Sequence, residues 1–432
     1  MSTPPPAESA PGDAVARPIV ERDALPLADL QILDLSRLLP GGFCSLLLAD
    51  LGADVIKVED TGAGDYVRWA PPYYGGDEHT DLGTRSALYL ALNRNKRSIR
   101  IDLKHERGRE TLLRLAEHAD VVLESFRPGV MDRLGVGFEA LRERNPALVY
   151  CAITGYGQTG SHAARAGHDM NYLALNGMLG QTGAPGGPPV QPAGQIADLG
   201  GGASMAAIGI LAAVHSARAS GRGQMVDISM TDGSLSWLAM VAGRHLAEGS
   251  SPARGHQELS GGLACYAVYQ AADGFVACGA LEPKFWQVLC RGVDREDLIE
   301  HQYAPPGSEG REAVAALFAE RTRGEWRVFN DTHDCCIEPV LDLDEALGSQ
   351  LVAEREMVVE LDQPQLGPVR QLGTPIRLSE TPGGLHRPAP ALGEHTAEIL
   401  AQAGMGDEQI AELTEAGAVV GQGSAATEPF MY

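Results

Sequence analysis

The sequence is short of basic side chains. Its 432 residues include 34 Lys and Arg against 57 Asp and Glu, which gives a formal net charge of −23. Surfaces that bind nucleic acid or anionic lipid need clustered Lys and Arg, because both partners are covered with phosphates. We therefore expect neither nucleic acid nor a membrane as a partner. A local basic segment could still hold an anionic ligand.

The sequence also lacks a clear membrane helix, a signal peptide and a disulfide pattern. Its best apolar run, Leu199 to Val214, is shorter than the ~20 residues that cross a bilayer. Residues 1–18 have no basic start and no apolar stretch. The seven cysteines include no C-x-x-C pair, which is typical of reduced thiols. These absences predict a cytoplasmic protein.

Short apolar runs alternate with helical patterns through the first half of the chain. The predicted strands are residues 31–35, 53–58, 98–102, 119–123 and 148–154. Strands that alternate with helices indicate βαβ units and a parallel sheet, so the fold class is α/β. Ligands of such sheets bind beyond the carboxyl ends of the strands.

Changes in composition divide the chain. A hairpin signal at 271–274, between two short strands, begins a region with different spacing. The predicted divisions are a disordered Pro-rich leader at 1–26, a large α/β domain at 27–247, a linker at 248–262, a small domain at 263–350, a return to the large domain with C-terminal helices at 351–420, and a tail at 421–432.

One glycine motif suggests a dinucleotide site, but its context does not. Gly155-Tyr-Gly-Gln-Thr-Gly160 matches G-x-G-x-x-G after a predicted strand. A dinucleotide site needs a helix directly after the glycines, and residues 161–169 show no amphipathic pattern. The motif also follows the fifth strand and not the first. NAD binding is therefore not favoured.

The segment from Arg94 to Arg109 is locally basic, with seven Lys and Arg against two acidic residues. Pairs along an exposed helix face explain Arg107 and Arg109. Between Arg94 and Lys104, anion binding is favoured over a solvated helix face, because Lys and Arg clamp phosphates.

Three further positions carry acid–base side chains in suggestive surroundings. His168 and Asp169 follow the fifth predicted strand between glycine-rich segments, although a single His is often structural. Asp198 precedes three glycines and an apolar helix, where it serves either as an N-cap or beside a substrate that approaches the backbone. Glu282 precedes Pro283 at a helix start, which is also an ordinary cap position.

The order of these segments resembles the family III CoA-transferase superfamily and, within it, the α-methylacyl-CoA racemases. The matching segments are LLADLGADVIKVE, NRNKRSIRIDLK, SFRPGVMDRLGVG, TGYGQTG, GHDMNY, DLGGGASM, GRGQMVDISMTDGS and ACGALEPKFW. The resemblance runs from about Leu27 to Thr374. It implies a Rossmann-like parallel-sheet large domain with an inserted small α+β domain, in an interlocked homodimer.

The resemblance also implies roles for particular residues. The catalytic residues would be His168, Asp169, Asp198 and Glu282, with His168 and Asp198 as the two bases and Glu282 assisting the histidine. Contacts with an acyl-CoA thioester would come from Arg37, Arg94, Lys96, Arg97, Ile101, Asp102, Leu103, Lys104, Arg127, Gly167, Met170, Asn171 and Tyr172. No cofactor or metal is expected, because CoA is part of the substrate.

Two reactions remain open. A racemase inverts the α-carbon of a 2-methylacyl-CoA, and a transferase uses the carboxylate at Asp169 as a nucleophile that forms an acyl anhydride. Transferases of the family usually carry an aromatic residue where His168 stands and a longer loop where Ser260-Gly-Gly262 stands. Both features favour the racemase. The C-terminal extension also resembles that of many transferase-like members and keeps the alternative open.

Overall fold

The computed structural model describes residues 15–16, 20–76 and 83–423. The chain forms two compact units. The large unit lies within Met1–Tyr172, Gly194–Ser234 and Ser349–Tyr432, and the small unit comprises Leu173–Ala193 and Leu235–Gly348. The predicted boundaries differ at two places, because residues 173–193 and 235–262 pack with the small unit and not with the large domain or a linker.

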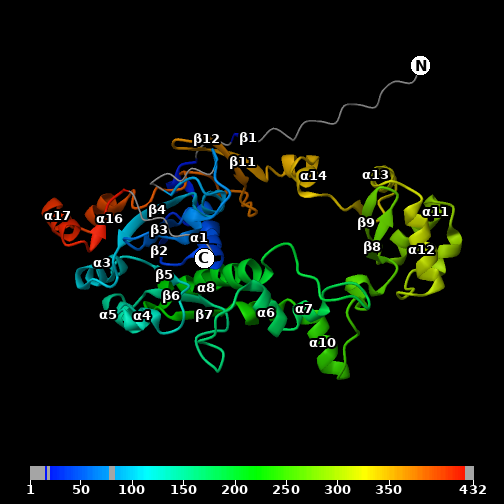
Figure 1. The fold of residues 1–432 in the computed structure, drawn as a ribbon, viewed down its shortest axis with the longest axis horizontal. Coiled ribbons are helices and arrows are strands. Elements are labelled where there is room, and N and C mark those ends of the chain that lie inside the picture. Colours follow the sequence, from blue (N-terminus) through cyan, green and yellow to red (C-terminus); the bar gives the residue numbers. More distant parts are fainter. Residues whose placement is uncertain (1–14, 17–19, 77–82, 424–432) are drawn as a thin grey trace, which may run out of the picture. The chain divides into compact units, whose positions relative to one another are not determined.

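The centre of the large unit is a seven-stranded sheet in the order β13-β4-β3-β2-β5-β6-β7 (Figure 1). The strands are β2 (Gln31–Asp34), β3 (Asp54–Glu59), β4 (Lys96–Ile101), β5 (Val121–Glu124), β6 (Val149–Thr154), β7 (Met225–Ser229) and β13 (Val419–Val420). All neighbours are parallel except β13, which pairs antiparallel with β4. The predicted α/β class with a parallel sheet is confirmed.

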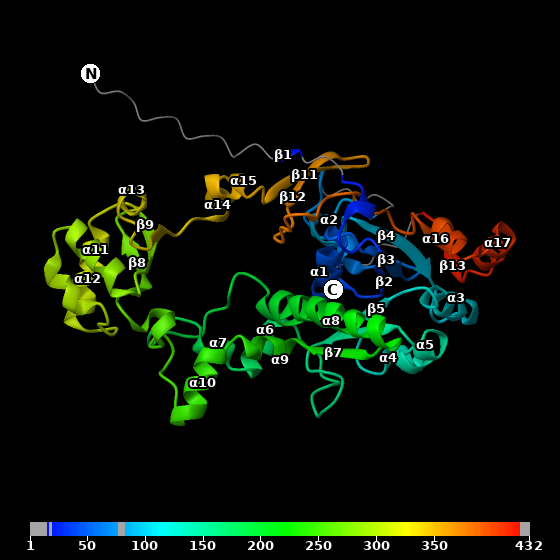
Figure 2. The same ribbon diagram turned by 180° about the vertical axis from the view of Figure 1, so that it is seen from behind.

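Helices surround this sheet. Those of the large unit are α1 (Leu38–Asp50), α2 (Ala87–Asn93), α3 (Glu106–Ala116), α4 (Val130–Arg133), α5 (Phe138–Arg144), α6 (Asp169–Leu175, which ends in the small unit), α8 (Met205–Ser220), α9 (Met230–Ser236, likewise), α15 (Gln350–Glu354), α16 (Thr396–Gln402) and α17 (Asp407–Glu415), with the short helices η1 (Arg22–Ala24), η2 (Tyr66–Trp69) and η3 (Ile196–Ser204). Figures 1 and 2 show α8 beside β7. On one sheet face, Leu33 and Ile99 pack with Leu112 of α3 and Leu400 of α16.

The strand order indicates where a ligand would bind to the central sheet. From β2 the chain builds outward to β3 and β4, and then returns to the other side of β2 with β5, β6 and β7. The order therefore reverses between β2 and β5. In open α/β sheets, ligands bind at such a reversal, outside the carboxyl ends of the strands.

A second sheet in the large unit joins both ends of the chain. It has the order β1 (Val15–Ala16), β11 (Val358–Gln363) and β12 (Gly367–Leu372), and β1 runs parallel to β11. The prediction of a disordered leader over 1–26 is therefore wrong for residues 15–16, which pair with residues 359–360. It is also wrong for residues 20–26, which include η1 and the buried Leu25. Residues 1–14, 17–19 and 424–432 of the predicted leader and tail lie outside the described residues.

The small unit is built on an antiparallel sheet with the order β10-β9-β8. Its elements are α7 (Met178–Gln181), α10 (Ala239–Glu248), η4 (Glu258–Gly262), β8 (Tyr266–Ala271), β9 (Gly274–Gly279), α11 (Pro283–Gly292), η5 (Glu296–His301), α12 (Glu309–Ala319), α13 (Arg323–His333), β10 (Ile337–Pro339) and α14 (Leu343–Leu347). Trp286, Phe318 and Trp326 are buried in its core. The small unit therefore combines an antiparallel sheet with helices.

One described helix, Ile196–Ser220, is long and apolar enough to cross a membrane by length and composition. Half of its most apolar window is buried inside the protein, and core helices of soluble proteins pass the same test. It includes the π-helical turn η3, which leads into α8.

Candidate active site

The loop after β6 is held against the ring of Tyr172. The Tyr172 hydroxyl donates a hydrogen bond to the Gly167 carbonyl, and the ring lies edge-on to Tyr156 at 5.2 Å between centroids. A Cβ at Gly155 or at Gly167 would overlap the Tyr172 ring. Two glycines of this region are thus needed for the close approach of an aromatic side chain. The packing fixes the start of α6, where Asp169 lies.

Asp169 and Asp198 are brought together in the large unit. The backbone N–H of Asp198 donates to Oδ1 of Asp169 at 2.9 Å. Burial first, and then the negative charge of Asp169, raise the pKa of the Asp198 carboxyl from 3.8 to about 7. A carboxyl with this pKa is present in both protonation states at neutral pH, so it can act as an acid and as a base.

Asp198 lies inside a π-helical turn, a rare geometry that often marks functional sites. Gln195 occupies the N-cap position, so the reading of Asp198 as an N-cap is wrong. The glycines that follow serve packing: a Cβ at Gly201 would lie 2.6 Å from the Ser234 nitrogen, and one at Gly202 would lie 2.8 Å from Met230 Cγ. The expectation that a substrate approaches these two glycines is therefore wrong.

His168 precedes α6 with an exposed side chain. Its backbone N–H donates to Oδ1 of Asn171 at 3.0 Å, and its carbonyl accepts from the Asn171 N–H at 2.8 Å. Met170 is 46% exposed, whereas Tyr172 is buried. The residues predicted from the GHDMNY segment therefore form one turn. It presents the imidazole to solvent and the carboxylate of Asp169 toward Asp198.

Glu282 belongs to the small unit. It is the exposed N-cap residue of α11 and makes no side-chain capping hydrogen bond. Burial raises the pKa of the Cys336 thiol, and the negative charges of Asp334 and Glu282 raise it further. Glu282 therefore lies near Cys336, which lines a cavity.

That cavity has a volume of about 710 Å³ and is bounded by the free face of the small sheet and by three loops. Its walls include Leu259, Tyr266, Val268 and Ala277. Val268 is 60% exposed, although it is apolar. The small unit thus carries an open apolar hollow next to a carboxylate.

The basic segment is used inside the protein, so the prediction that its first residues bind an anion is wrong. Arg94 is buried and holds Asp50 through two bonds of 2.7 and 3.0 Å. Arg97 holds Asp54 in the same way at 2.6 and 3.0 Å. Both guanidinium groups are buried, and each is already paired with a carboxylate.

Lys96 is fully buried and lies 3.6 Å from Asp34. Burial lowers the pKa of Lys96 to about 8. Its ammonium also donates to the Gly42 carbonyl and to Asn93, both at 3.0 Å. It therefore cannot reach a ligand outside the protein, and the prediction of a CoA contact at Lys96 is also wrong.

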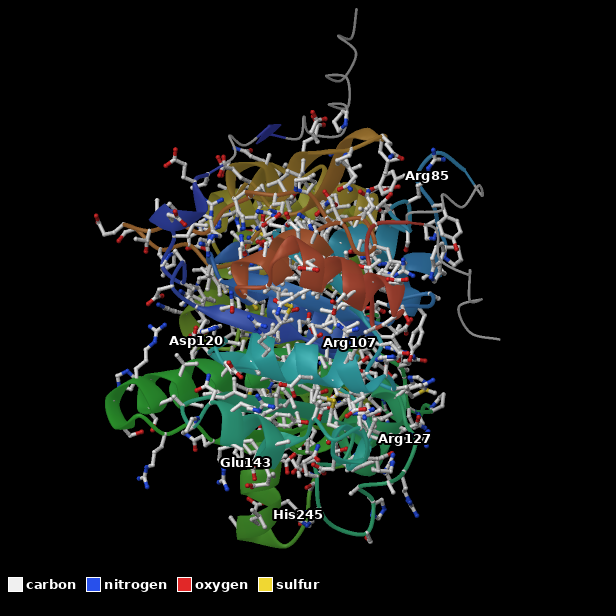
Figure 3. The ribbon with its side chains drawn as sticks, turned by 90° about the vertical axis from the view of Figure 1, so that its left-hand side faces the viewer. Arg85, Arg107, Asp120, Arg127, Glu143 and His245 are labelled. Carbon is white, nitrogen blue, oxygen red and sulfur yellow. The ribbon has the colours of Figure 1, made fainter. Side chains whose placement is uncertain are left out.

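The remaining predicted CoA contacts lie at the carboxyl side of the sheet. Ile101 ends β4 and is buried, so its side chain cannot meet a ligand. Asp102 and Leu103 are half-buried, and Lys104 is exposed. Arg127 follows β5, and its side chain is exposed at the surface (Figure 3). The structure is compatible with ligand contacts at Lys104 and Arg127.

Arg37 lies at the reversal of strand order, directly after β2. Its guanidinium contacts Asp60 at 2.7 Å and lies over the rings of Tyr66 and Phe126 at 5.2 and 5.8 Å. Its backbone N–H donates to the Ser125 hydroxyl at 3.2 Å, which joins the two loops that flank the crevice. Tyr66 and Phe126 are additions to the predicted site. The strand order alone could have indicated Phe126, because it follows β5.

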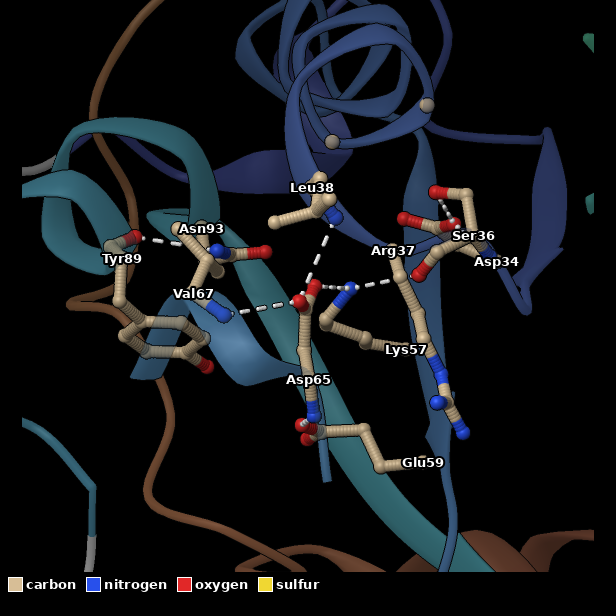
Figure 4. A network of polar contacts seen from close by, with 12 residues as sticks. Asp34, Ser36, Arg37, Leu38, Lys57, Glu59, Asp65, Val67, Tyr89 and Asn93 are labelled. Carbon is tan, nitrogen blue, oxygen red and sulfur yellow. Dashed lines mark hydrogen bonds and ion pairs between the residues drawn. The ribbon is translucent and has the colours of Figure 1, made fainter. Parts of the chain in front are cut away.

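A buried ionic network supports the Arg37 loop (Figure 4). The Lys57 ammonium pairs with Asp65 at 2.8 Å and donates to the Ser36 carbonyl at 3.1 Å. Asp65 also accepts the Leu38 N–H at 3.3 Å. Leu38 has a positive φ of 61°, which is strained for a residue with a branched side chain. The network holds this strained residue and so fixes the position of Arg37.

The described residues contain no group of three or more His, Cys, Asp or Glu placed to hold a metal ion. All seven cysteines are free thiols.

The fold and the site define an α/β enzyme-like scaffold, with a sheet-order reversal at Arg37 and a coupled pair of carboxylates after β6. The model of CoA-transferase family III matches residues 27–396, and the chain belongs to that family.

Its relatives catalyse more than one reaction. The chain is 36% identical to the mouse "Alpha-methylacyl-CoA racemase" over 400 residues, which cover 90% of this chain and 96% of that relative. It is 37% identical to the "Succinyl-CoA:mesaconate CoA-transferase" of Haloarcula hispanica over 400 residues, which cover 88% and 97%. A solved CAIB/BAIF family protein from Brucella suis superposes with a TM-score of 0.75 at 33% identity, covering 88% of this chain and 99% of that one. These comparisons confirm the resemblance to the family and to its racemases.

Proposed function

We propose that the protein inverts the α-carbon of a 2-methylacyl-CoA thioester by a two-base transfer of one proton. The observation that carries this proposal is the Asp198 carboxyl, which burial and Asp169 bring to a pKa of about 7. Proton removal and proton return need a group that works in both directions near neutral pH. An acyl-transfer mechanism needs one ionised carboxylate as its nucleophile and does not require a second carboxyl of raised pKa.

The proton moves through an enolate. One base takes the α-proton, so the C–H bond breaks and its electron pair moves into the thioester, which becomes an enolate. The second base, which stands protonated on the opposite face, then delivers its proton to the same carbon. His168 and Asp198 take these two roles. No cofactor enters this sequence of steps.

The enolate oxygen needs hydrogen-bond donors, but not all backbone groups of η3 are free to serve. The N–H of Asp198 is taken by Asp169, and the N–H of Leu199 donates to the Gln195 carbonyl at 2.9 Å. These two groups therefore do not stabilise the enolate. Donors further along the turn remain candidates.

The CoA nucleotide is assigned to the crevice between β2 and β5. Arg37 and Arg127 follow these two strands, and both sides of a strand-order reversal contribute to ligand sites in sheets of this kind. Arg37 is held over two aromatic rings, so its guanidinium is kept in one orientation. Phosphate groups suit the fixed donor geometry of arginine.

A family III CoA-transferase is the second candidate, because relatives of comparable identity carry that activity in their names. In that reaction the Asp169 carboxylate attacks the thioester carbonyl, and the C–S bond breaks to release CoA. The resulting acyl anhydride then passes its acyl group on. Hydroxylamine would trap this anhydride at Asp169.

One epimer of a 2-methylacyl-CoA, incubated in heavy water with the full chain, tests the proposed function. We expect deuterium at the α-carbon and a mixture of both epimers. Retention of the original proton and of the original configuration would refute the racemase.

We also propose that the protein is a homodimer, as the family resemblance implied. Apolar side chains stand exposed on helices of each unit: Ile208 of α8 is 62% exposed, and Met240 and Leu246 of α10 are 71% and 83% exposed. Such patches are typical of protein interfaces. Sedimentation equilibrium is expected to give twice the chain mass, and a monomer at micromolar concentration would contradict the dimer.

A further inference from the structure

A second cavity, which is polar and has a volume of about 190 Å³, lies at the amino ends of β3 and β4 in the central sheet. Asp54, the first residue of β3, and Asn95, which precedes β4, are among its lining residues. The candidate active site follows the carboxyl ends of β2, β5 and β6. In a parallel sheet the amino and carboxyl ends lie on opposite edges, so this cavity is separate from the proposed acyl-CoA site.

The two carboxylates in this cavity share one guanidinium, so together with Arg97 they carry a net charge of −1. Arg97 holds Asp54 through two hydrogen bonds and contacts Glu398 of α16 at 2.9 Å. Each nitrogen of the Arg97 guanidinium has a partner, including Gln402 at 2.7 Å from Nη1. With Arg22 and Arg387 the charged side chains of the lining sum to +1, which favours an anion over a cation.

Two other guanidinium groups line the same cavity without a buried carboxylate partner. Arg22 donates to the carbonyls of Ala28 at 2.8 Å and Gly52 at 3.4 Å. Its ion-pair partner among the described residues, Asp23, is 88% exposed. Arg387 is anchored through its backbone N–H, which donates to Asn95 Oδ1 at 3.0 Å. Among the described residues its side chain makes no ion pair and no hydrogen bond. The cavity thus keeps two positive charges available.

An imidazole with an unused nitrogen lies beside them. Nδ1 of His386 is buried and has no hydrogen-bond partner in the described part of the chain. Burial first, and then the charges of Arg387 and Arg22, lower the pKa of His386 to about 4. The backbone N–H of His386 is fixed by Asn95 at 2.8 Å. A buried polar atom without a partner costs free energy, unless a ligand supplies the partner.

We propose that this cavity is a binding site for a small dianion of the phosphate type, held by Arg22, Arg387 and the imidazole of His386. Two guanidinium groups match two negative charges, and planar guanidinium groups form paired hydrogen bonds with phosphate oxygens. The ligand is either free phosphate or the phosphate group of a small ester. This site is independent of the proposed racemase chemistry, because it lies at the other edge of the sheet.

Titration of inorganic phosphate into the full chain, followed by calorimetry in a phosphate-free buffer, tests the proposal. We expect one site per chain and the same affinity with and without saturating CoA. Arg387→Gln is expected to weaken binding about tenfold. The matched control Arg222→Gln, at an exposed arginine outside the cavity, is expected to bind as the wild type does. Displacement of phosphate by CoA would place the phosphate in the acyl-CoA site and overturn the proposal.

The pKa of the His386 imidazole gives a second measurement, which uses the wild-type protein and does not depend on the folding of any variant. The charged groups that face it come from η1 (Arg22), β3 (Asp54), β4 (Arg97), the segment before α16 (Arg387) and α16 itself (Glu398). A bound dianion adds negative charge beside this imidazole, so phosphate should raise its pKa in a histidine NMR titration. An unchanged titration curve with saturating phosphate would overturn the proposal, as would equal affinities of wild type and Arg387→Gln.

Discussion

Replacing Asp198 by Asn removes an ionisable group whose pKa differs between the folded and unfolded protein. The folded value is about 7, against an ordinary value of 3.8. The unfolded chain therefore releases this proton first as the pH rises, and ionisation favours unfolding between about pH 4 and pH 7. The wild type loses folding free energy across this window, whereas Asp198→Asn has no proton to lose.

The size of the effect follows from the shift. Three pKa units correspond to about 4 kcal/mol, and we expect about 2 to 4 kcal/mol because the side chain is only partly buried. At pH 4 the variant and the wild type should be almost equally stable. At pH 8 Asp198→Asn should be more stable by that amount.

Urea unfolding of both proteins at several pH values measures this difference. Other titrating groups are shared, so they cancel between wild type and variant. Asp232→Asn, an exposed carboxyl on α9, is the control and should show no such pH dependence. Asp169→Asn removes the like charge but keeps an oxygen for the Asp198 N–H, so it should reduce the pH dependence without abolishing it. A stability difference that is constant from pH 4 to pH 8 would refute the raised pKa of Asp198.

Four further outcomes are expected. His168→Ala should slow α-proton exchange at least about a hundredfold from one epimer and less from the other, as α-deuterium NMR would show; equal losses would contradict roles on separate faces. Arg37→Gln should raise KM for acyl-CoA about tenfold with little change in kcat in steady-state assays; an unchanged KM would move the nucleotide elsewhere. Arg94→Ala should lower the unfolding free energy by about 3 kcal/mol in urea, because Asp50 loses its buried partner, and should leave KM unchanged. Gly233→Ala should cost about 3 kcal/mol in the same measurement, because its Cβ would overlap a carbonyl oxygen of η3; wild-type stability would contradict that close packing.

The parallel sheet could be predicted because each strand carries its own signal. Apolar runs bounded by turn residues mark β2 to β6 without any knowledge of their neighbours. The role of Asp198 as a base is implied by the family resemblance and not by its local surroundings, because its interpretation as an N-cap is wrong. Its contact with Asp169 joins residues 29 positions apart, and only the folded chain shows which atoms meet.

The basic segment shows where sequence reasoning fails. Counting Lys and Arg between 94 and 109 ignores carboxylates far away in the chain, and the partners of Arg94 and Arg97 are Asp50 and Asp54. The Arg97–Asp54 pair forms when β4 lies beside β3, and the Arg94–Asp50 pair joins the segment before β4 to the end of α1. Conversely, Arg387 and Arg22 lie 365 positions apart, so no local pattern could place them in one cavity.

The most direct test of the central claim supplies both reactions in one tube. The full chain is incubated in heavy water with one epimer of a 2-methylacyl-CoA and a free carboxylic acid acceptor, and both products are followed. Two-base proton transfer predicts deuterium at the α-carbon and both epimers of the original thioester, with no CoA on the added acid. A new thioester of the added acid, with the α-proton and configuration of the donor unchanged, would contradict the racemase.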